Sequence, residues 1–284
     1  MKSKSQLYSI WVRYRKNKLA ITGTVIFAII LFFAIAAPLF ASYDDDAVGL
    51  HISDRLQWPN SEHIFGTDSF GRDVFARVIY GARYSIGLGL AIMIIGLVGG
   101  VICGAVAGFY SGKIDGIIMR IMDIFLALPS TMLAIAVVAA LGQGVWNLVI
   151  AMSISKIPQF ARIVRSVVLP IRNREFVEAA RSEGANNGYI IFRHILPNAL
   201  GPIIVQATLD VSKIILAIAS LSFVGLGVPA PIPEWGVMLS DAQSLLRDSA
   251  YLAIFPGLAI CLTAMSLNLI GDGLRDALDP KQKN

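Results

Sequence analysis

The amino-acid sequence predicts an all-α membrane protein, a bundle of six transmembrane helices with both termini in the cytoplasm. Of its 284 residues, 56% are hydrophobic and only 15% are charged, whereas soluble domains contain about 25% charged residues. Several long runs carry no charge, and each is long enough to cross a bilayer as a helix. Basic residues gather at the N-terminus and in the middle of the chain, a distribution that is typical of cytoplasmic segments.

Composition and motifs argue against several other classes of protein. The net charge of +5 would suit a nucleic-acid-binding protein, but the basic residues are divided among loops and form no basic face interleaved with aromatic residues. His51, His63 and His194 lack the spacing of metal ligands. The pair Gly112-Lys113 lacks the first glycine and the Ser or Thr of a P-loop. We therefore expect this chain to bind no nucleic acid, no metal and no nucleotide.

Residues 1–18 form the predicted cytoplasmic N-terminus, and residues 19–40 form the first transmembrane helix. The N-terminal part contains six basic residues and no acid. At about 1.5 Å per residue the following uncharged run is about 33 Å long, which is enough to span the hydrocarbon core and longer than the apolar part of a signal peptide. Cleavage near Ala34-Ile35-Ala36 is therefore the less favoured interpretation.

Residues 41–85 form a predicted external segment. They contain seven acids and four arginines, in contrast to the basic N-terminus. Asp68 is a candidate N-cap for a helix that presents an apolar side made of Val74, Phe75, Val78 and Ile79. We expect this helix to lie along the outer interface of the membrane.

Residues 86–270 form the predicted core, which contains the other five transmembrane helices. The second helix, over 86–109, has glycines at four-residue intervals, a pattern that lets helix backbones pack closely in lipid: Gly96, Gly100, Gly104 and Gly108. A short charged loop follows over 113–123. Residues 124–155 carry no charge and contain the turn Gly142-Gln143-Gly144, so they predict the third and fourth helices.

The fifth predicted helix, over about 199–226, contains Asp210 and Lys213 deep in an apolar run. These opposite charges lie three residues apart on one helix face, and two interpretations remain open: they neutralise each other, or they line a translocation path. A loop rich in Gly and Pro follows and is predicted to be external, with Trp235 at interface depth. The sixth helix covers 251–270, and a cytoplasmic tail covers 271–284.

The segment 156–197 is a polar island between two apolar runs, and residues 156–194 hold seven Lys/Arg and three Glu. A first helix is expected from Arg174 to Glu183, with Asn173 as its cap and Gly184 as the residue that ends it. Turn residues and a second short helix follow, which gives a helix-turn-helix outside the bilayer. Val177, Ala180 and Gly184 share one face, with Ala179 beside them. Such small residues predict a face that another surface can approach closely.

Glu178-Ala179-Ala180, followed by Gly184 and by Leu196-Pro197, resembles the EAA signature of binding-protein-dependent ABC importer permeases. The stretches before the second and after the fifth predicted helix resemble the peptide and nickel branch of that family, in its second permease subunit. The resemblance implies a six-helix ABC importer permease bundle whose polar island is a coupling helix, which sits in a groove of a cytoplasmic ATPase. Its implied location is the cytoplasmic (inner) membrane.

The same resemblance implies partners and residue roles. The partners would be a second homologous permease subunit, two cytoplasmic ATPases that hold ATP and Mg²⁺, and an extracytoplasmic substrate-binding protein, all in membrane lipid. Glu178 would orient the coupling helix, and Ala179 and Ala180 would permit close docking. Gly184 would turn the chain, and Leu196-Pro197 would pass the motion to the fifth helix.

The implied function is ATP-driven import of short peptides, such as dipeptides or oligopeptides, into the cytoplasm. Nickel or a metal chelate is the alternative substrate, because both branches share these motifs. A membrane scaffold or receptor without transport is a different class, which would need no coupling loop. The HExxH and GxSxG motifs of hydrolases do not occur, so we expect no enzyme activity in this chain.

Overall fold

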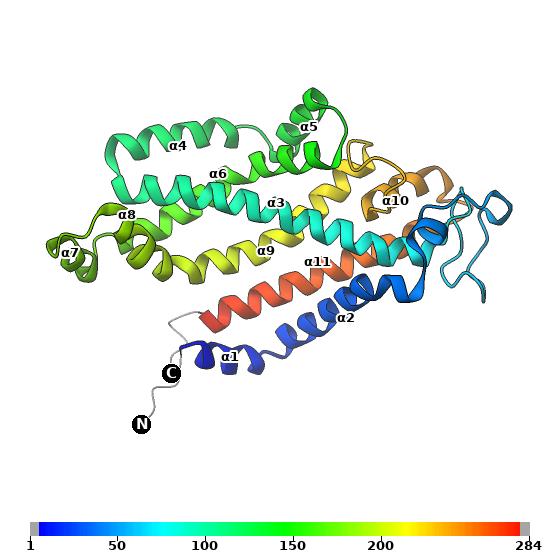
Figure 1. The fold of residues 1–284 in the computed structure, drawn as a ribbon, viewed down its shortest axis with the longest axis horizontal. Helices are drawn as coiled ribbons and strands as arrows, with labels where there is room; N and C mark the ends of the chain where they lie inside the picture. Colours follow the sequence, from blue (N-terminus) through cyan, green and yellow to red (C-terminus); the bar gives the residue numbers. More distant parts are fainter. Residues whose placement is uncertain (1–5, 279–284) are drawn as a thin grey trace.

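Long helices make up most of the chain and run side by side along one axis (Figure 1). The computed structural model describes residues 6–278. Within this range the β-type pairing is an isolated bridge between Thr67 and Asp73, so the predicted all-α class is confirmed for the described residues. The helices are, in chain order, α1 (Gln6–Lys16), α2 (Lys18–Phe40), η1 (Tyr43–Ala47), η2 (Ile52–Asp54), α3 (Val74–Tyr110), α4 (Gly112–Leu126), α5 (Ser130–Leu141), α6 (Val145–Ile171), α7 (Glu175–Ser182), α8 (Asn187–Tyr189), η3 (Ile190–Ile195), α9 (Leu196–Phe223), α10 (Trp235–Ala242), η4 (Gln243–Leu245) and α11 (Tyr251–Leu278).

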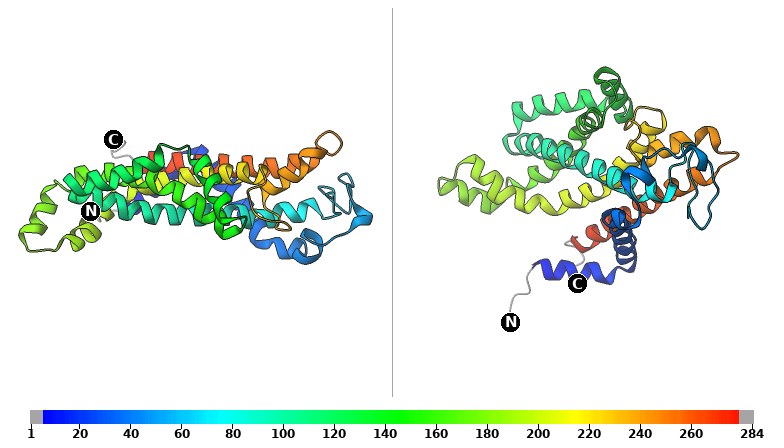
Figure 2. Two further views of the ribbon diagram at one scale, coloured as in Figure 1. Left: turned by 90° about the horizontal axis from the view of Figure 1, so that it is seen from above. Right: turned by 45° about the vertical axis from the view of Figure 1, so that its right-hand side comes forward.

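The bundle has two distinct ends. The segment between α2 and α3 lies at one end together with α10, and we call this the α10 end (Figures 1 and 2). The opposite end carries α7 and α8, and we call it the α7 end. Helix α3 packs most extensively against α6, while α11 packs against both α2 and α9. Helix α1 and the last turn of α11 lie toward the α7 end (Figure 1).

Four helical segments are long and apolar enough to cross a membrane: Lys18–Phe40, Val74–Tyr110, Asn187–Phe223 and Tyr251–Leu278. Helices α4 and α5 make a fifth candidate if they are one span, although they are bent by 82°. Helix α6 has 27 residues, the length of a span, but includes Lys156, Arg162 and Arg165. Length and composition therefore support four or five spans among the described residues.

The predicted interfacial helix is wrong as a separate element, because residues 74–110 form one helix. Asp73 caps this helix, and its Oδ1 accepts a hydrogen bond from the N–H of Ala76 at 2.7 Å. Asp68, the predicted cap, instead accepts from the N–H groups of Phe70 and Arg72. Residues 74–110 contain no proline, so every backbone N–H after the first turn can donate within the helix. The helix therefore continues past residue 86 without a break.

Four other predicted boundaries also differ from the structure. The charged loop over 113–123 is the amphipathic helix α4, and the chain breaks after it, at Pro129. Helix α6 continues to Ile171, past the predicted end at residue 155. Helices α8, η3 and α9 join into one segment from Asn187 to Phe223, and the predicted tail is helical to Leu278. The rest of the tail, 279–284, and the N-terminal residues 1–5 with Lys2 and Lys4 lie outside the described residues.

Trp235 is buried within the protein, with 1% of its surface exposed, and its depth relative to the membrane interface stays a prediction. It begins α10, a short helix that folds back against α9 and α11. The indole Nε1 donates a hydrogen bond to the main-chain oxygen of Val78 at 2.9 Å. Gly81 makes this approach possible, because a Cβ there would lie 2.9 Å from the Trp235 ring. The indole therefore ties α10 to α3.

Candidate functional site: the segment between α6 and α9

Helix α7 ends in the geometry that its glycine predicts. Gly184 has φ +86°, a left-handed conformation that favours glycine. The N–H of Ala185 donates to the oxygen of Ala180 at 3.0 Å, and the N–H of Gly184 donates to Arg181 at 3.1 Å, which is the Schellman pattern. At the other end the N-cap is Arg174, not the predicted Asn173, and its side chain makes no capping bond.

The inner face of α7 is the one that the sequence analysis expected to meet a partner. Val177 is fully buried and Ala180 is 8% exposed, and both pack in a cluster with Ile190 and Ile195 of η3. The same cluster contains Val164 and Val168 of α6, so the chain itself covers this face of α7. The coupling role of Ala180 stays a prediction. Glu178, Ala179 and Gly184 lie on the exposed side.

Exposed aromatic side chains occur in α7 and in the helix that follows it, and the sequence did not single them out. Phe192 is 75% exposed, Tyr189 is 52% exposed and Phe176 is 37% exposed. The imidazole of His194 lies 5.5 Å from the ring of Tyr189 and 6.5 Å from that of Phe176. Their presence in an otherwise polar island was a signal in the sequence, because large aromatic residues are enriched at protein interfaces.

Two arginines link neighbouring helices close to this segment. Arg172, directly after α6, donates from Nη1 to the oxygen of Phe109 at 3.0 Å and so caps the end of α3. Arg165 in α6 makes a bidentate ion pair with Asp115 in α4, with N–O distances of 2.5 and 2.6 Å. A cavity of about 340 Å³ lies beside the first contact and is lined by Phe109, Tyr110, Arg172, Asn173, Arg181 and Asn187. Arg172 thus joins the start of the α7 segment to α3, and Arg165 joins α6 to α4.

The second half of the site runs without interruption into α9. The side chain of Asn186 accepts from the N–H of Tyr189 at 2.8 Å and caps the helix. The helix is π-helical over Ile190–Ile195 and becomes α-helical at Leu196. Leu196 is half-buried, and Pro197 is exposed in the first turn of α9, where the ring is tolerated.

The charged pair predicted in the fifth helix is present in α9. The Nζ of Lys213 lies 3.4 Å from Oδ1 of Asp210, whose side chain is 3% exposed, while that of Lys213 is 63% exposed. Gln206 donates to the other carboxylate oxygen at 3.1 Å. A third charge was missed: Lys156 of α6 is 6% exposed and interacts electrostatically with both Asp210 and Lys213. The sequence analysis had put Lys156 in the polar island because it ended the helix too early.

The glycine stripe of α3 lies against α6. A Cβ added at Gly96 would lie 2.9 Å from Cβ of Lys156, and one added at Gly108 would lie 2.9 Å from Cβ of Val168. Added Cβ atoms at Gly100 and Gly104 would overlap Phe160 and Ala161 of α6. These glycines therefore let the two helices approach, and Gly96 leaves room for the buried Lys156.

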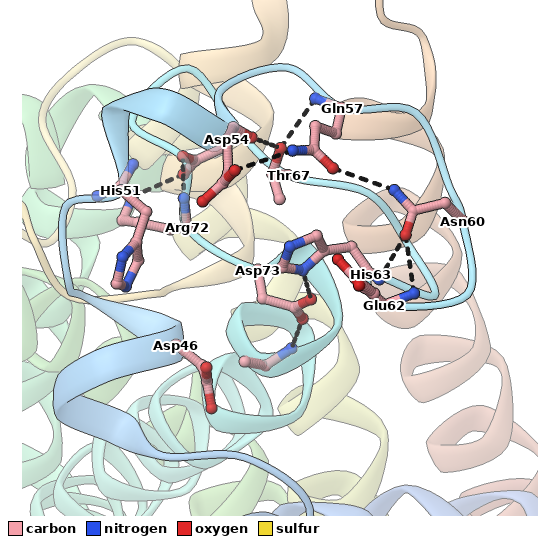
Figure 3. Close-up of polar contacts among 12 residues, drawn as sticks. Asp46, His51, Asp54, Gln57, Asn60, Glu62, His63, Thr67, Arg72 and Asp73 are labelled. Carbon is pink, nitrogen blue, oxygen red and sulfur yellow. Dashed lines mark hydrogen bonds and ion pairs between the residues drawn. The ribbon is translucent and has the colours of Figure 1, made fainter.

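A polar network organises the segment at the α10 end (Figure 3). The hydroxyl of Thr67 accepts from the N–H of Gln57 at 2.9 Å. His63 Nδ1 lies 2.8 Å from Oδ2 of Asp73, the residue that caps α3. In α10, burial raises the pKa of Asp241, which lies 3.8 Å from Arg72. Within residues 6–278 no group of three His, Cys, Asp or Glu side chains is arranged to hold a metal ion.

Comparison with known proteins identifies the family. Residues 100–284 match the family described as "binding-protein-dependent transport system inner membrane component", and residues 5–59 match the "N-terminal TM domain of oligopeptide transport permease C". The dipeptide transport system permease protein DppC of Alkalihalophilus pseudofirmus is 50% identical over 95% of this chain and 88% of its own length. The oligopeptide transport system permease protein OppC of Bacillus subtilis is 44% identical over 96% and 90%.

Further comparisons agree at the level of sequence and of fold. The glutathione transport system permease protein GsiD of Pectobacterium atrosepticum is 44% identical over 96% of this chain and 91% of its own length. An inward-facing structure of the MetNI methionine ABC transporter has a TM-score of 0.59 at 19% identity, over 72% of this chain and 96% of that one, which shows a shared fold. The matched families and the extent of these identities show that the chain belongs to the family of inner-membrane permease components of binding-protein-dependent ABC transport systems.

Proposed function

We propose that this chain is the permease subunit of an ATP-driven, binding-protein-dependent importer that moves short peptides into the cytoplasm. The observation that carries this proposal is the identity of 43 to 50% with permeases whose names specify dipeptides, oligopeptides, di- or tripeptides and glutathione, which is itself a tripeptide. These names favour a peptide over nickel or a metal chelate. The chain itself is a membrane subunit and not an enzyme, since permease subunits of this family do not hydrolyse ATP.

The proposed topology has six spans with both termini in the cytoplasm. The four unbroken candidate spans become six if the bent α4–α5 pair and α6 each cross the membrane once. An even number of spans fits the position of α1 and the end of α11, which both lie toward the α7 end (Figure 1). That end also carries Arg172, Arg174, Arg181 and Arg193, so it is proposed to be cytoplasmic, and the α10 end external.

The α7 segment is proposed to dock into a groove of a partner ATPase. Glu178 and Ala179 lie on the exposed side of α7, where Phe176 and Phe192 add apolar surface. Ala180 lies on the opposite, buried side of α7, where it packs against the rest of the chain and holds the helix in place. Closure of the two ATPases on ATP and Mg²⁺ would move α7. The continuous helix through Leu196 and Pro197 would carry that motion into α9 and rock the bundle between outward-open and inward-open states.

The proposed complex contains this chain, a second homologous permease subunit, two ATPases and an external substrate-binding protein, all embedded in membrane lipid. ATP and Mg²⁺ belong to the ATPases, and nucleic acid has no part in the complex. A non-transporting scaffold is the competing function, and it differs in one measurable respect: it would not retain an ATPase with Walker motifs.

The test is co-purification of ATPase subunits after gentle detergent extraction, together with peptide-stimulated ATPase activity. Glu178→Lys and Gly184→Trp should both lose the ATPases while the chain stays in the membrane. The second change acts through the left-handed backbone of Gly184, because a Cβ there meets nothing within 4 Å. Glu62→Lys is the matched control, since it makes the same charge change at an exposed position at the α10 end. Retention of ATPases by both α7 variants would overturn the coupling role.

A further inference from the structure

Helix α9 carries a polar stripe along a face that the rest of the chain does not cover. Gln206, Lys213 and Ser220 follow one another at intervals of seven residues, so they lie on the same side of the helix. Lys213 and Ser220 are exposed, and Gln206 is half-buried. Leu216 is exposed on the same face, and the Ser220 hydroxyl donates to the oxygen of Leu216 at 2.8 Å, so the charge of Lys213 is the feature that lipid would not tolerate. This charge favours water, substrate or another protein beside Lys213 over hydrocarbon.

The charges around this stripe do not balance within the described chain. Lys156 and Lys213 are two cations that interact with a single carboxylate, Asp210. Lys156 is fixed in the core beside Gly96, and Asp210 is 3% exposed and held by Gln206. With both lysines charged, one positive charge remains, and the ammonium of Lys213, which lies 3.4 Å from Asp210 but is 63% exposed, is the one that an anion from outside the chain can reach.

The stripe continues into a cavity toward the α7 end. This cavity has a volume of about 470 Å³ and lies between α6, α9 and α11. Its polar lining comes from Ser166 of α6, Gln206 of α9 and Arg275 of α11. Gln206 belongs both to the stripe and to the cavity, whose lining is otherwise mainly apolar, so Gln206 links two sites that each carry a cation, Lys213 and Arg275.

We infer that Lys213 binds the C-terminal carboxylate of the transported peptide and is a specificity-determining residue of the translocation path. The inference rests on the proposed peptide import. A peptide carries one carboxylate at its C-terminus, and an ammonium held in a low-dielectric region attracts that group much more strongly than it would in water. The peptide carboxylate would thereby supply the negative charge that the chain lacks beside Lys213. Arg275 would then bind the same carboxylate nearer the proposed cytoplasmic exit.

The test compares transport of a dipeptide with transport of the same dipeptide amidated at its C-terminus. The assembled complex is placed in proteoliposomes with enough peptide to saturate the binding protein, so turnover reports translocation. Lys213→Met should lower the turnover of the free dipeptide about tenfold, the effect of losing one charge-assisted hydrogen bond, and leave that of the amidated peptide unchanged. Lys213→Arg should keep most of the turnover for both peptides. Lys113→Met, an exposed lysine of α4, is the matched control.

Lys213→Met is a suitable variant because Asp210 keeps its hydrogen bond from Gln206 and its electrostatic interaction with Lys156. Equal slowing of the free and the amidated dipeptide would mean that Lys213 only neutralises Asp210, and would overturn the inference. Loss of the second permease subunit from the variant complex would mean that Lys213 pairs with an acid of that subunit, which also overturns it. If the wild-type complex retains its ATPases but takes up neither peptide, the proposed substrate fails and the inference with it.

Discussion

The guanidinium of Arg83 donates a hydrogen bond to the main-chain oxygen of Ala34, a carbonyl that its own helix cannot satisfy. Ala34 lies four residues before Pro38, which has no N–H to donate within α2. Arg83 also donates to the next oxygen, that of Ile35, at 2.9 Å. A side chain of α3 thus repairs the hydrogen-bond ladder of α2, and the two helices are held together where the proline interrupts one of them.

This relationship predicts a dependence between Arg83 and Pro38. Arg83→Leu leaves the Ala34 oxygen without a donor and should lower the free energy of unfolding by about 1 kcal/mol. Pro38→Ala restores the N–H, so Arg83→Leu should cost less in that background. Unfolding in SDS, followed by circular dichroism for the wild type and the three variants, measures the coupling. Equal costs in both backgrounds would contradict the proposed repair.

The glycine stripe predicts a contrast between two glycines of the same helix. Gly100→Ala should destabilise the bundle by about 1–3 kcal/mol, because the added Cβ overlaps Phe160 near the backbone of α6 and neither helix can yield easily. Gly87→Ala should be neutral or stabilising by up to about 1 kcal/mol, since nothing lies within 4 Å of its Cβ and alanine favours the helix. Thermal unfolding in detergent compares them, and similar losses for both would argue against close packing of α3 on α6.

The two faces of α7 predict different failures for neighbouring alanines. Ala180→Leu should disturb the packing of α7 on η3, because Ala180 is 8% exposed against buried isoleucines, and should make residues 175–195 more sensitive to protease. Ala179→Leu should leave the protease pattern unchanged, since this side chain is exposed, but should weaken retention of the ATPases. Limited proteolysis and co-purification separate the two effects, and identical behaviour of both variants would refute the assignment of faces.

The buried charges of α6 and α9 predict a compensating pair of substitutions. Asp210→Asn leaves Lys156 buried without a carboxylate and should destabilise the protein by about 3 kcal/mol. Adding Lys156→Met removes the unpaired charge and should recover most of that loss, because an apolar side chain suits the same space. Unfolding in SDS measures both variants. A double variant that is less stable than Asp210→Asn alone would show that Lys156 has another role.

Local chemistry in the sequence accounts for a large part of the fold and of the candidate site. Uncharged runs predicted the helices around 19–40, 86–109 and 251–270, because length and apolarity suffice to specify a helix in lipid. Gly184 predicted the end of α7, since a left-handed residue at that position needs no tertiary partner. The spacing from Glu178 to Pro197 indicated the family, which the comparisons confirm.

Helix ends and helix faces were the parts that the sequence misassigned. The predicted break before residue 86 is absent. The 82° bend between α4 and α5 occurs beside Pro129, a residue type that can kink a helix. Lys156 was assigned to the polar island, and Trp235 to an external loop at interface depth, and neither assignment anticipated that the side chain would be buried in the protein. Their actual burial depends on Gly96 and Gly81, which are distant in the sequence.

The sequence by itself therefore determined that the chain is helical, apolar enough for a membrane and marked by a permease motif, because these properties depend on residues close together in the chain. Tertiary structure alone decided which side of α7 is exposed and which carbonyl oxygen accepts from Arg83. It also decided that Lys156 of α6 lies near Asp210 and Lys213 of α9. Each of these depends on residues tens of positions apart that meet only when helices pack, and no local pattern records which helix face meets which neighbour.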